Sequence, residues 1–252
     1  MTIFQIHIFG LTIAPSYYGL MYAIGFIAGY YYFLKKNIIK KQELENLFFY
    51  IFLGVVLGGR IGYILFYDLS SYINNPLNII KIWQGGMSFH GGFLGVILAT
   101  FIFSRNYKIN FWKIIDELAV IVPIGLGAGR IGNYLNKELL GFTNYTGPLA
   151  IEKSGIYYFP SPLLESFLEG FLLLIILYFI NKNKSFLGQT SVYFLIFYSL
   201  FRIFVESFFR TPDIQIGYIF GFLTMGEILS LPMLGLGMFL LFTLKKFDFD
   251  KK

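Results

Sequence analysis

Several charged side chains stand at helical spacing inside long apolar stretches of the sequence. Arg130 and Arg202 each lie within such a stretch, where a charge is costly and usually faces the interior of a helix bundle. Tyr198, Arg202 and Glu206 follow one another in four-residue steps, and Arg210 continues the series. On a helix this spacing places a phenol, two guanidinium groups and a carboxylate on one face. Because a guanidinium keeps hydrogen-bond donors after it pairs with one carboxylate, the stripe predicts a site for a phosphate or another anion.

Two structural interpretations of these arginines compete with the anion site. Arg130 and Arg202 lie toward the outer ends of their apolar stretches, where long cationic side chains can reach lipid headgroups. The stripe around Arg202 can also be an ion-pair ladder whose charges only stabilise one another. Asn133, three residues after Arg130, shares its helix face, so both arginines have polar neighbours. Spacing alone leaves all three interpretations open.

A lone histidine lies in the glycine-rich segment Gly85-Gly86-Met87-Ser88-Phe89-His90-Gly91-Gly92. Glycines allow a close approach of backbone to a neighbouring helix or to a bound headgroup. Imidazole titrates close to neutral pH and can act as a general base there. A structural role for His90 is equally compatible with this sequence.

Composition places these residues in a membrane. The chain has 252 residues, of which 56% are hydrophobic and 13% charged, with a mean hydropathy of +0.66, whereas soluble domains are about a quarter charged. Its 31 Phe and 19 Tyr exceed what one soluble core buries. This composition excludes disorder and a nucleic-acid-binding domain, and it predicts an all-α polytopic membrane protein. With no cysteine and two histidines, His7 and His90, the sequence predicts no disulfide, metal cluster or cysteine nucleophile.

Seven segments meet the requirement of about 20 mostly apolar residues for a membrane-spanning helix. They cover residues 17–34, 47–66, 86–103, 114–134, 162–180, 190–209 and 218–244. Residues 1–14 are too few to span the membrane, and we expect them, with His7, to lie in the membrane interface.

Close packing and buried charge are both expected within the spans. Small residues at four-residue intervals predict tight helix contacts at Gly54, Gly58 and Gly62, at Gly91 and Gly95, and at Gly125 and Gly129. A third intramembrane arginine, Arg60, is expected to pair with a buried acid, for which the candidates are Glu165, Glu169 and Glu227. Asp116 and Glu117 are expected at the cytoplasmic interface.

The distribution of positive charge predicts the orientation. Thirteen Lys and Arg residues follow the first, third, fifth and seventh segments, and four lie in or beside the opposite connections. By the positive-inside rule, the N-terminus is outside and the C-terminus cytoplasmic. The long connections 67–85 and 135–161 then form a small extracytoplasmic loop domain on a single integral membrane domain, 1–252.

A thirteen-residue segment resembles the signature of the prolipoprotein diacylglyceryl transferases: Gly129-Arg130-Ile131-Gly132-Asn133-Tyr134-Leu135-Asn136-Lys137-Glu138-Leu139-Leu140-Gly141. The family pattern is Gly-Arg-x-Gly-Asn-Phe-apolar-Asn-x-Glu-x-x-Gly, and Tyr134 is its one departure. Residues 17–22, 86–92, 202–206 and 209–213 resemble further family motifs, so the likeness covers about residues 15–226. Phe159 and Leu164 stand where the family has His and Tyr.

The resemblance implies a function for the site. It implies transfer of the diacylglyceryl group of phosphatidylglycerol to a cysteine thiol of a prolipoprotein, in the bacterial inner membrane, with the active site toward the outer leaflet. The product is a thioether, glycerol phosphate leaves, and no metal, cofactor or nucleic acid takes part. Catalytic roles are implied for Tyr18, His90, Arg130 and Arg202, with His90 as the candidate base. Phosphatidylglycerol binding is implied for Arg130, Asn133, Glu138, Gly141, Tyr198, Glu206 and Arg210.

Two other classes of function fit the residues alone. A transporter or channel for an anionic solute would use Arg130 and Arg202 to line its path, but it should show repeated halves or broken helices near mid-membrane. No internal repeat is evident in the sequence. A membrane scaffold whose charges only pair with one another would lose stability, and no activity, on Arg130→Lys or Arg202→Lys.

Overall fold

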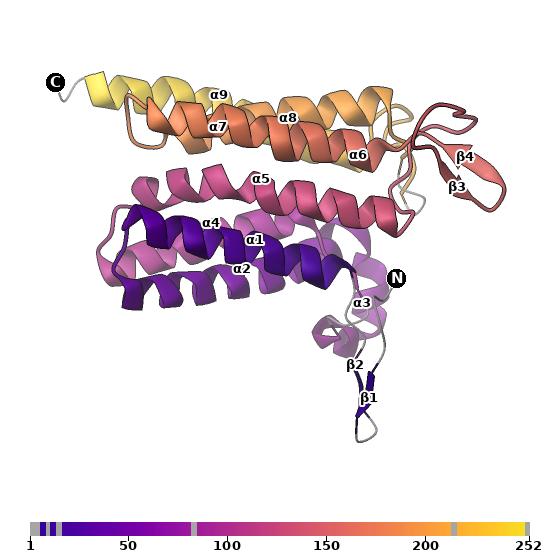
Figure 1. Ribbon diagram of the computed structural model, residues 1–252, viewed down its shortest axis with the longest axis horizontal. Helices are drawn as coiled ribbons and strands as arrows, with labels where there is room; N and C mark the ends of the chain where they lie inside the picture. Colours follow the sequence, from indigo (N-terminus) through magenta and orange to yellow (C-terminus); the bar gives the residue numbers. More distant parts are fainter. Residues whose placement is uncertain (1–5, 9–10, 14–16, 82–84, 213–215, 250–252) are drawn as a thin grey trace. The chain divides into compact units, whose positions relative to one another are not determined.

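The computed structural model describes residues 6–8, 11–13, 17–81, 85–212 and 216–249. The chain forms two compact units, one of Met1–Tyr32 with Asp116–Lys252 and the other of Phe33–Ile115. We call the first unit 1 and the second unit 2. In chain order (Figure 1) the elements are β1 (Ile6–Ile8), β2 (Leu11–Ile13), α1 (Tyr17–Lys36), α2 (Lys41–Tyr67), α3 (Leu69–Asn74), η1 (Pro76–Ile80), α4 (Phe89–Tyr107), α5 (Phe111–Leu135), β3 (Ile151–Lys153), β4 (Ile156–Tyr158), α6 (Ser161–Glu165), η3 (Ser166–Leu172), α7 (Leu173–Lys182), α8 (Gln189–Phe208) and α9 (Met225–Phe249).

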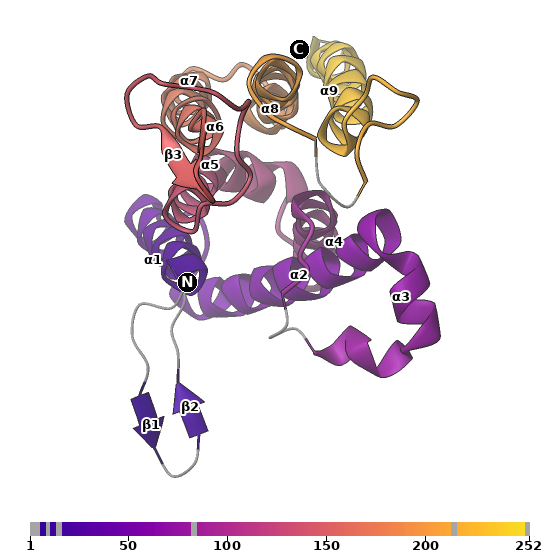
Figure 2. The ribbon, with the colours of Figure 1, turned by 90° about the vertical axis from the view of Figure 1, so that its right-hand side faces the viewer.

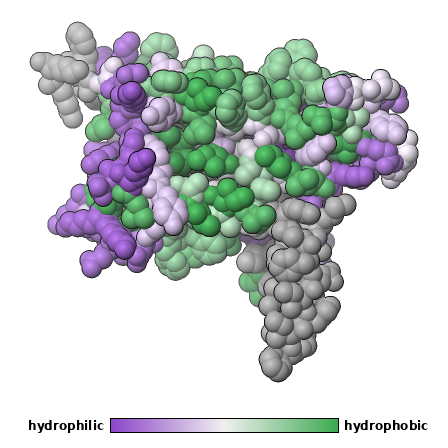
Figure 3. Space-filling view, in the orientation of Figure 1, coloured by the Kyte–Doolittle hydropathy of each residue, from purple (hydrophilic) through white to green (hydrophobic). Residues whose placement is uncertain are grey.

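The prediction of an all-α membrane protein is confirmed. Among the described residues, four helical stretches are long and apolar enough to cross a membrane: Lys41–Tyr67, Ser161–Lys182, Gln189–Phe208 and Met225–Lys246. On the face drawn in Figure 3, apolar side chains cover the middle of the helices and hydrophilic ones gather toward their ends. The other three predicted spans are helices α1, α4 and α5, of 20, 19 and 25 residues. The count of seven spans stays a prediction.

In unit 2, α2 packs against α4 through glycines, as predicted. A Cβ at Gly58 would lie 2.8 Å from Cα of Gly95, and one at Gly91 would lie 2.6 Å from Cα of Gly62. Side chains at these positions would therefore force the two helices apart. The helix α4 begins at Phe89, three residues after the first residue of the predicted span, because Gly85 and Gly86 have φ of 85° and 77°.

The acidic partner predicted for Arg60 is wrong: among the described residues, its hydrogen-bond partners are backbone carbonyls. Its side chain is buried on α2 and donates hydrogen bonds of 2.6–3.3 Å to four backbone carbonyls, those of Ile79, Asn78, Lys81 and Gly86. It also donates to the carbonyl of Gly85. Its guanidinium also lies 5.1 Å from the centre of the Tyr72 ring. The ends of short helices leave carbonyls without intrahelical partners, and Arg60 satisfies several around η1. Glu165, Glu169 and Glu227 have their own partners within unit 1.

In unit 1, the middle of α5 packs against two other helices through glycines. A Cβ at Gly25 of α1 would lie 3.0 Å from Cα of Gly125, and a Cβ at Gly170 of η3 would lie 2.6 Å from Cα of Gly127. η3 is a π-helical stretch, a local widening that often occurs at functional sites. The predicted contact at Gly129 is wrong, because no described atom lies within 4 Å of a Cβ built there.

Helices α8 and α9 lie side by side in unit 1 (Figure 2). The predicted start of the last span at residue 218 is wrong, since α9 begins at Met225. Before it, Phe220 and Gly221 have positive φ of 55° and 82°, and the amide of Ile219 donates to the carbonyl of Leu223 at 2.7 Å. These residues form a tight turn instead of a helix.

Two short hairpins complete unit 1. Strands β3 and β4 pair antiparallel, with Ile151 opposite Tyr158, inside the connection 135–161. At the departure from the family pattern, the Phe159 ring lies 5.0 Å from that of Phe142 and 5.2 Å from that of Phe209. Strands β1 and β2 pair near the N-terminus, and their placement in the membrane interface stays a prediction.

Candidate active site

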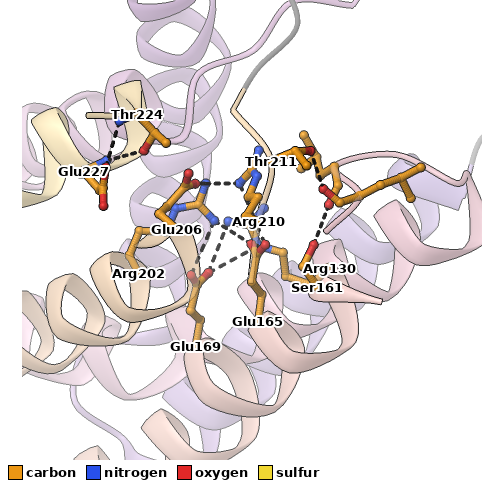
Figure 4. A network of polar contacts seen from close by, with 12 residues as sticks. Arg130, Ser161, Glu165, Glu169, Arg202, Glu206, Arg210, Thr211, Thr224 and Glu227 are labelled. Carbon is orange, nitrogen blue, oxygen red and sulfur yellow. Dashed lines mark hydrogen bonds and ion pairs between the residues drawn. The ribbon is translucent and has the colours of Figure 1, made fainter. Parts of the chain in front are cut away.

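Six charged side chains form one buried network in unit 1 (Figure 4). They come from four helical segments and the end of one: Arg130 from α5, Glu165 from α6, Glu169 from η3, Arg202 and Glu206 from α8, and Arg210 just after α8. Three guanidinium groups meet three carboxylates, so the formal charges balance. We call these six residues the arginine–glutamate cluster.

Glu165 is the hub of this cluster. One of its oxygens, Oε2, lies 2.9 Å from Nε of Arg130 and 2.5 Å from Nη1 of Arg202. The other, Oε1, lies 3.8 Å from Nη1 of Arg210. Its side chain is fully buried, where a charge needs such partners. A single carboxylate from another helix therefore brings Arg130 together with Arg202 and Arg210, which lie far from it in the sequence.

Glu169 and Glu206 complete the pairing on either side of this hub. Oε2 of Glu169 lies 3.3 Å from Nε and 3.2 Å from Nη2 of Arg130. Its Oε1 lies 3.6 Å from Nη1 of Arg202. Oε1 of Glu206 lies 2.5 Å from Nη2 of Arg202, as an ion pair, and accepts a hydrogen bond from Nη1 of Arg210 at 2.9 Å. The predicted stripe on α8 is thus confirmed as an ion-pair series, and it extends onto α5, α6 and η3.

The cluster has hydrogen-bonding capacity left over on both sides. Among the described residues, no group accepts a hydrogen bond from Nη1 of Arg130 or Nε of Arg202, because their ion pairs use the other guanidinium nitrogens. Likewise, Oε1 of Glu165 and Oε1 of Glu169 are buried without a hydrogen bond from any described group. A network with unused donors can accept an anion without first losing every existing bond.

The predicted residues Tyr198, Asn133 and Glu138 lie in the same unit. Tyr198 is buried one turn before Arg202 on α8, with its ring stacked 5.6 Å from that of Phe194. Asn133 is buried near the end of α5, and its carbonyl accepts from the backbone amide of Glu138 at 2.9 Å. Glu138 itself is exposed.

Gly141 joins the signature segment to the end of α8. It forms an antiparallel bridge with Arg210, and its amide donates to the carbonyl of Phe159 at 3.0 Å. A Cβ on Gly141 would lie 2.8 Å from that same carbonyl oxygen, closer than real side chains approach. Nearby, the hydroxyl of Thr211 donates to the carbonyl of Leu140 at 2.9 Å. Gly141 therefore lets the connection 135–161 fix the backbone of Arg210.

The two remaining predicted site residues are His90 and Tyr18. His90 belongs to unit 2, as the second residue of α4, with its Nε2 buried and its ring edge-to-face with Phe89 at 5.3 Å. The N-cap of this helix, Ser88, accepts from the amide of Gly91 at 3.3 Å. The backbone of Tyr18 lies in the first turn of α1, and its side chain is outside the described residues.

Glu165 and Glu169 belong to the arginine–glutamate cluster, although the sequence predicted them only as partners of Arg60. They stand four residues apart in an apolar stretch, and intramembrane carboxylates at helical spacing are themselves a signal of a site. Across the described part of the chain, no group of His, Asp and Glu has an arrangement that would hold a metal ion.

The fold and this cluster define a helical integral membrane protein with a buried, arginine-rich site suited to an anion. The family model for prolipoprotein diacylglyceryl transferase matches residues 3–243. The phosphatidylglycerol–prolipoprotein diacylglyceryl transferase of Rickettsia felis is 47% identical over 239 residues, covering 91% of this chain and 92% of that one. Those of Rickettsia akari and Rickettsia canadensis are each 46% identical, covering 91% and 89% of this chain and 92% and 90% of theirs. The chain belongs to the prolipoprotein diacylglyceryl transferase family.

Proposed function

We propose that this protein transfers the diacylglyceryl group of phosphatidylglycerol to the cysteine thiol of a prolipoprotein, with the arginine–glutamate cluster as the phosphate site. The observation that carries the proposal is the convergence of three arginines on Glu165, with donors of Arg130 and Arg202 left unused. Family membership supports the reaction, and the transporter alternative has no comparable support.

Charge development explains why arginines suit this reaction. The phosphodiester of phosphatidylglycerol carries one negative charge, and the departing glycerol phosphate gains a second as the carbon–oxygen bond breaks. Guanidinium groups already held in place by Glu165 and Glu169 need little reorganisation to stabilise that charge. Interactions that strengthen as the bond breaks raise the rate of the chemical step and not only the affinity.

The nucleophile comes from the protein substrate, since this chain has no cysteine. Its sulfur attacks the glyceryl carbon that bears the phosphate oxygen, the carbon–oxygen bond breaks, and the bonding electrons stay with glycerol phosphate. The thiol proton must leave, because the thiolate is the reactive form. His90 is the proposed base, and Tyr18, Asn133, Glu138, Gly141 and Tyr198 are the proposed residues that shape the lipid site.

The proposed topology has seven spans, an outer N-terminus and a cytoplasmic C-terminus in the bacterial inner membrane. The lysine-rich ends of the first, third, fifth and seventh predicted spans support this orientation. Arg210 follows the opposite end of α8 from Lys184, which supports an active site toward the outer leaflet. The connections 67–85 and 135–161 are then extracytoplasmic parts of a single membrane domain.

Mass spectrometry of a synthetic peptide substrate tests the function. Purified protein is incubated in detergent with phosphatidylglycerol and a precursor peptide that contains one cysteine. We expect a mass gain of one diacylglyceryl group, and no gain with a Cys→Ser peptide. The absence of any gain from folded, lipid-bound protein would contradict the proposal and lead to anion-flux assays in vesicles.

A further inference from the structure

The first turn of α9 is fixed beside the arginine–glutamate cluster by a capping box. The amide of Thr224 donates to Oε2 of Glu227 at 2.8 Å, and the amide of Glu227 donates to the hydroxyl of Thr224 at 3.1 Å. These reciprocal bonds satisfy amides that have no helical partner. The hydroxyl of Ser207 on α8 donates to Oε1 of the same Glu227 at 2.5 Å. The start of α9 is therefore linked to α8 at the residue that follows Glu206; Figure 4 shows Thr224 and Glu227 of this turn near Glu206.

Gly226 lies within this turn, directly against the carboxylate of Glu206. A Cβ at Gly226 would lie 2.6 Å from Oε1, 2.7 Å from Cδ and 3.1 Å from Cγ of Glu206. Oε1 is the atom that forms ion pairs with both Arg202 and Arg210. Gly226 has no positive φ, so the requirement here is for space and not for an unusual backbone conformation.

The carboxylate of Glu206 has little freedom to avoid an added methyl group. Its side chain is buried, and two guanidinium groups hold the oxygen that a Cβ would approach. The backbone of the first turn of α9, which carries Gly226, is held by the capping box and by the hydrogen bond from Ser207. Any adjustment must therefore move Oε1 relative to the arginines or move the start of α9.

We propose that Gly226 is a positioning residue for the proposed phosphate site, acting through Glu206 on Arg202 and Arg210. Because Gly226 has no side chain, the carboxylate of Glu206 fits between α8 and α9. The position of this carboxylate sets the spacing of the guanidinium groups of Arg202 and Arg210. The inference rests on the proposed function, because the property that Gly226 controls is recognition of the phosphatidylglycerol phosphate.

Gly226→Ala tests the proposal in the full-length protein. We expect kcat/KM for phosphatidylglycerol to fall about tenfold to a hundredfold, since displacements of about 1 Å at a reacting centre have effects of that size. The KM for the precursor peptide should stay within about twofold, because the peptide does not bind Glu206 in this account. A purely structural role would lower the yield of folded protein without this selective effect.

Gly235→Ala on the same helix is the matched control. It makes the same chemical change with the same gain in helix propensity, but no described atom lies within 4 Å of a Cβ at this position. We expect wild-type kcat/KM for both substrates. An equal loss in the Gly235 and Gly226 variants would overturn the proposal.

A double-mutant cycle with Glu206→Ala separates action through Glu206 from a general effect on α9. Glu206→Ala removes the side-chain atoms that a Cβ at residue 226 would approach. In that background, Gly226→Ala should change the residual activity by less than a further twofold and should leave the lipid-dependent shift of the unfolding midpoint unchanged. Full additivity of the two losses would contradict the proposal. If the Gly226→Ala single variant fails to fold, the double variant should fold, and failure of both would also contradict it.

The outcomes distinguish the inference from the function on which it rests. Wild-type protein without any transfer activity would remove the proposed function. Active wild-type protein with an unaffected Gly226→Ala variant would remove only the inference.

Discussion

Two buried polar clusters occupy opposite ends of the helices of unit 1, and they differ in how completely their carboxylates are satisfied. At one end, Asp116 of α5 accepts from the amide of Gly188 at 3.0 Å, from the amide and hydroxyl of Ser191 at 3.0 Å each, and from Lys184 at 3.2 Å. These bonds cap the first turn of α8. At the other end, Oε1 of Glu165 has no hydrogen bond from any described group.

The comparison separates a network that holds the fold from one that can bind a substrate. Both oxygens of Asp116 accept hydrogen bonds, most of them from neutral donors. In the arginine–glutamate cluster, three arginines share three carboxylates, and Arg130 and Arg202 keep donors that no described group uses. Saturation stabilises one arrangement, whereas unused capacity lets an anion enter. Burial of charge alone does not tell the two apart.

The largest expected effect is that of Arg202→Ala. This variant removes the cation that contacts all three carboxylates, so transfer should fall by about 10³-fold, or ~4 kcal/mol of transition-state stabilisation. The peptide mass assay measures the loss, and gel filtration with circular dichroism checks that the variant is folded. Wild-type turnover by a folded variant would contradict the assignment of this cluster.

Asp116→Ala should act on stability instead of activity. Loss of the α8 cap and of the Lys184 pair should lower the free energy of unfolding by about 3 kcal/mol, measured as a lower midpoint of thermal unfolding in detergent. Activity per folded molecule should stay at the wild-type level. A selective loss of turnover without loss of stability would remove the distinction between the two clusters.

His90→Asn probes the proposed base in unit 2. At low pH the substrate thiol, with a pKa of about 8.5, is almost fully protonated and needs a base, so we expect a rate loss of about 10²-fold. As pH rises through the thiol pKa, thiolate becomes abundant and the variant should approach the wild-type rate. A variant with the same pH–rate profile as wild type would exclude His90 as the base.

The smallest expected effect is a lipid-dependent shift in thermal stability. Phosphatidylglycerol should raise the unfolding midpoint of the wild type by a few degrees more than a zwitterionic lipid does, because a ligand that binds only the folded state stabilises it. The difference should vanish in Arg202→Ala and persist in Asp116→Ala. Equal protection of the wild type by both lipids would argue against a headgroup site.

The helices could be predicted because each needs a long apolar stretch, and hydropathy reports that directly. The residue at which each helix begins could not be predicted, because it depends on the local backbone conformation. The positive φ of Gly85 and Gly86 keeps α4 from beginning before them, and the turn at Phe220 and Gly221 does the same for α9. Positive φ at glycine is common in turns, but the same residue also occurs inside helices such as α2.

The site could be predicted where its residues share one helix. Four-residue spacing revealed Arg202 and Glu206 together, and the signature segment revealed Arg130. Glu165 and Glu169 approach from a different helix with a π-helical stretch, so no local spacing connects them to the arginines. The partners of Arg60 also could not be predicted, because every residue has a backbone carbonyl and the residue type does not show which carbonyl accepts a hydrogen bond.

The most direct test of the central claim compares the two clusters in one experiment. Wild type, Arg130→Ala and Asp116→Asn are purified in parallel, normalised for folded protein, and assayed by peptide mass spectrometry with phosphatidylglycerol. The account predicts diacylglyceryl addition by the wild type and Asp116→Asn, and none by folded Arg130→Ala. Addition at the wild-type rate by Arg130→Ala would contradict it.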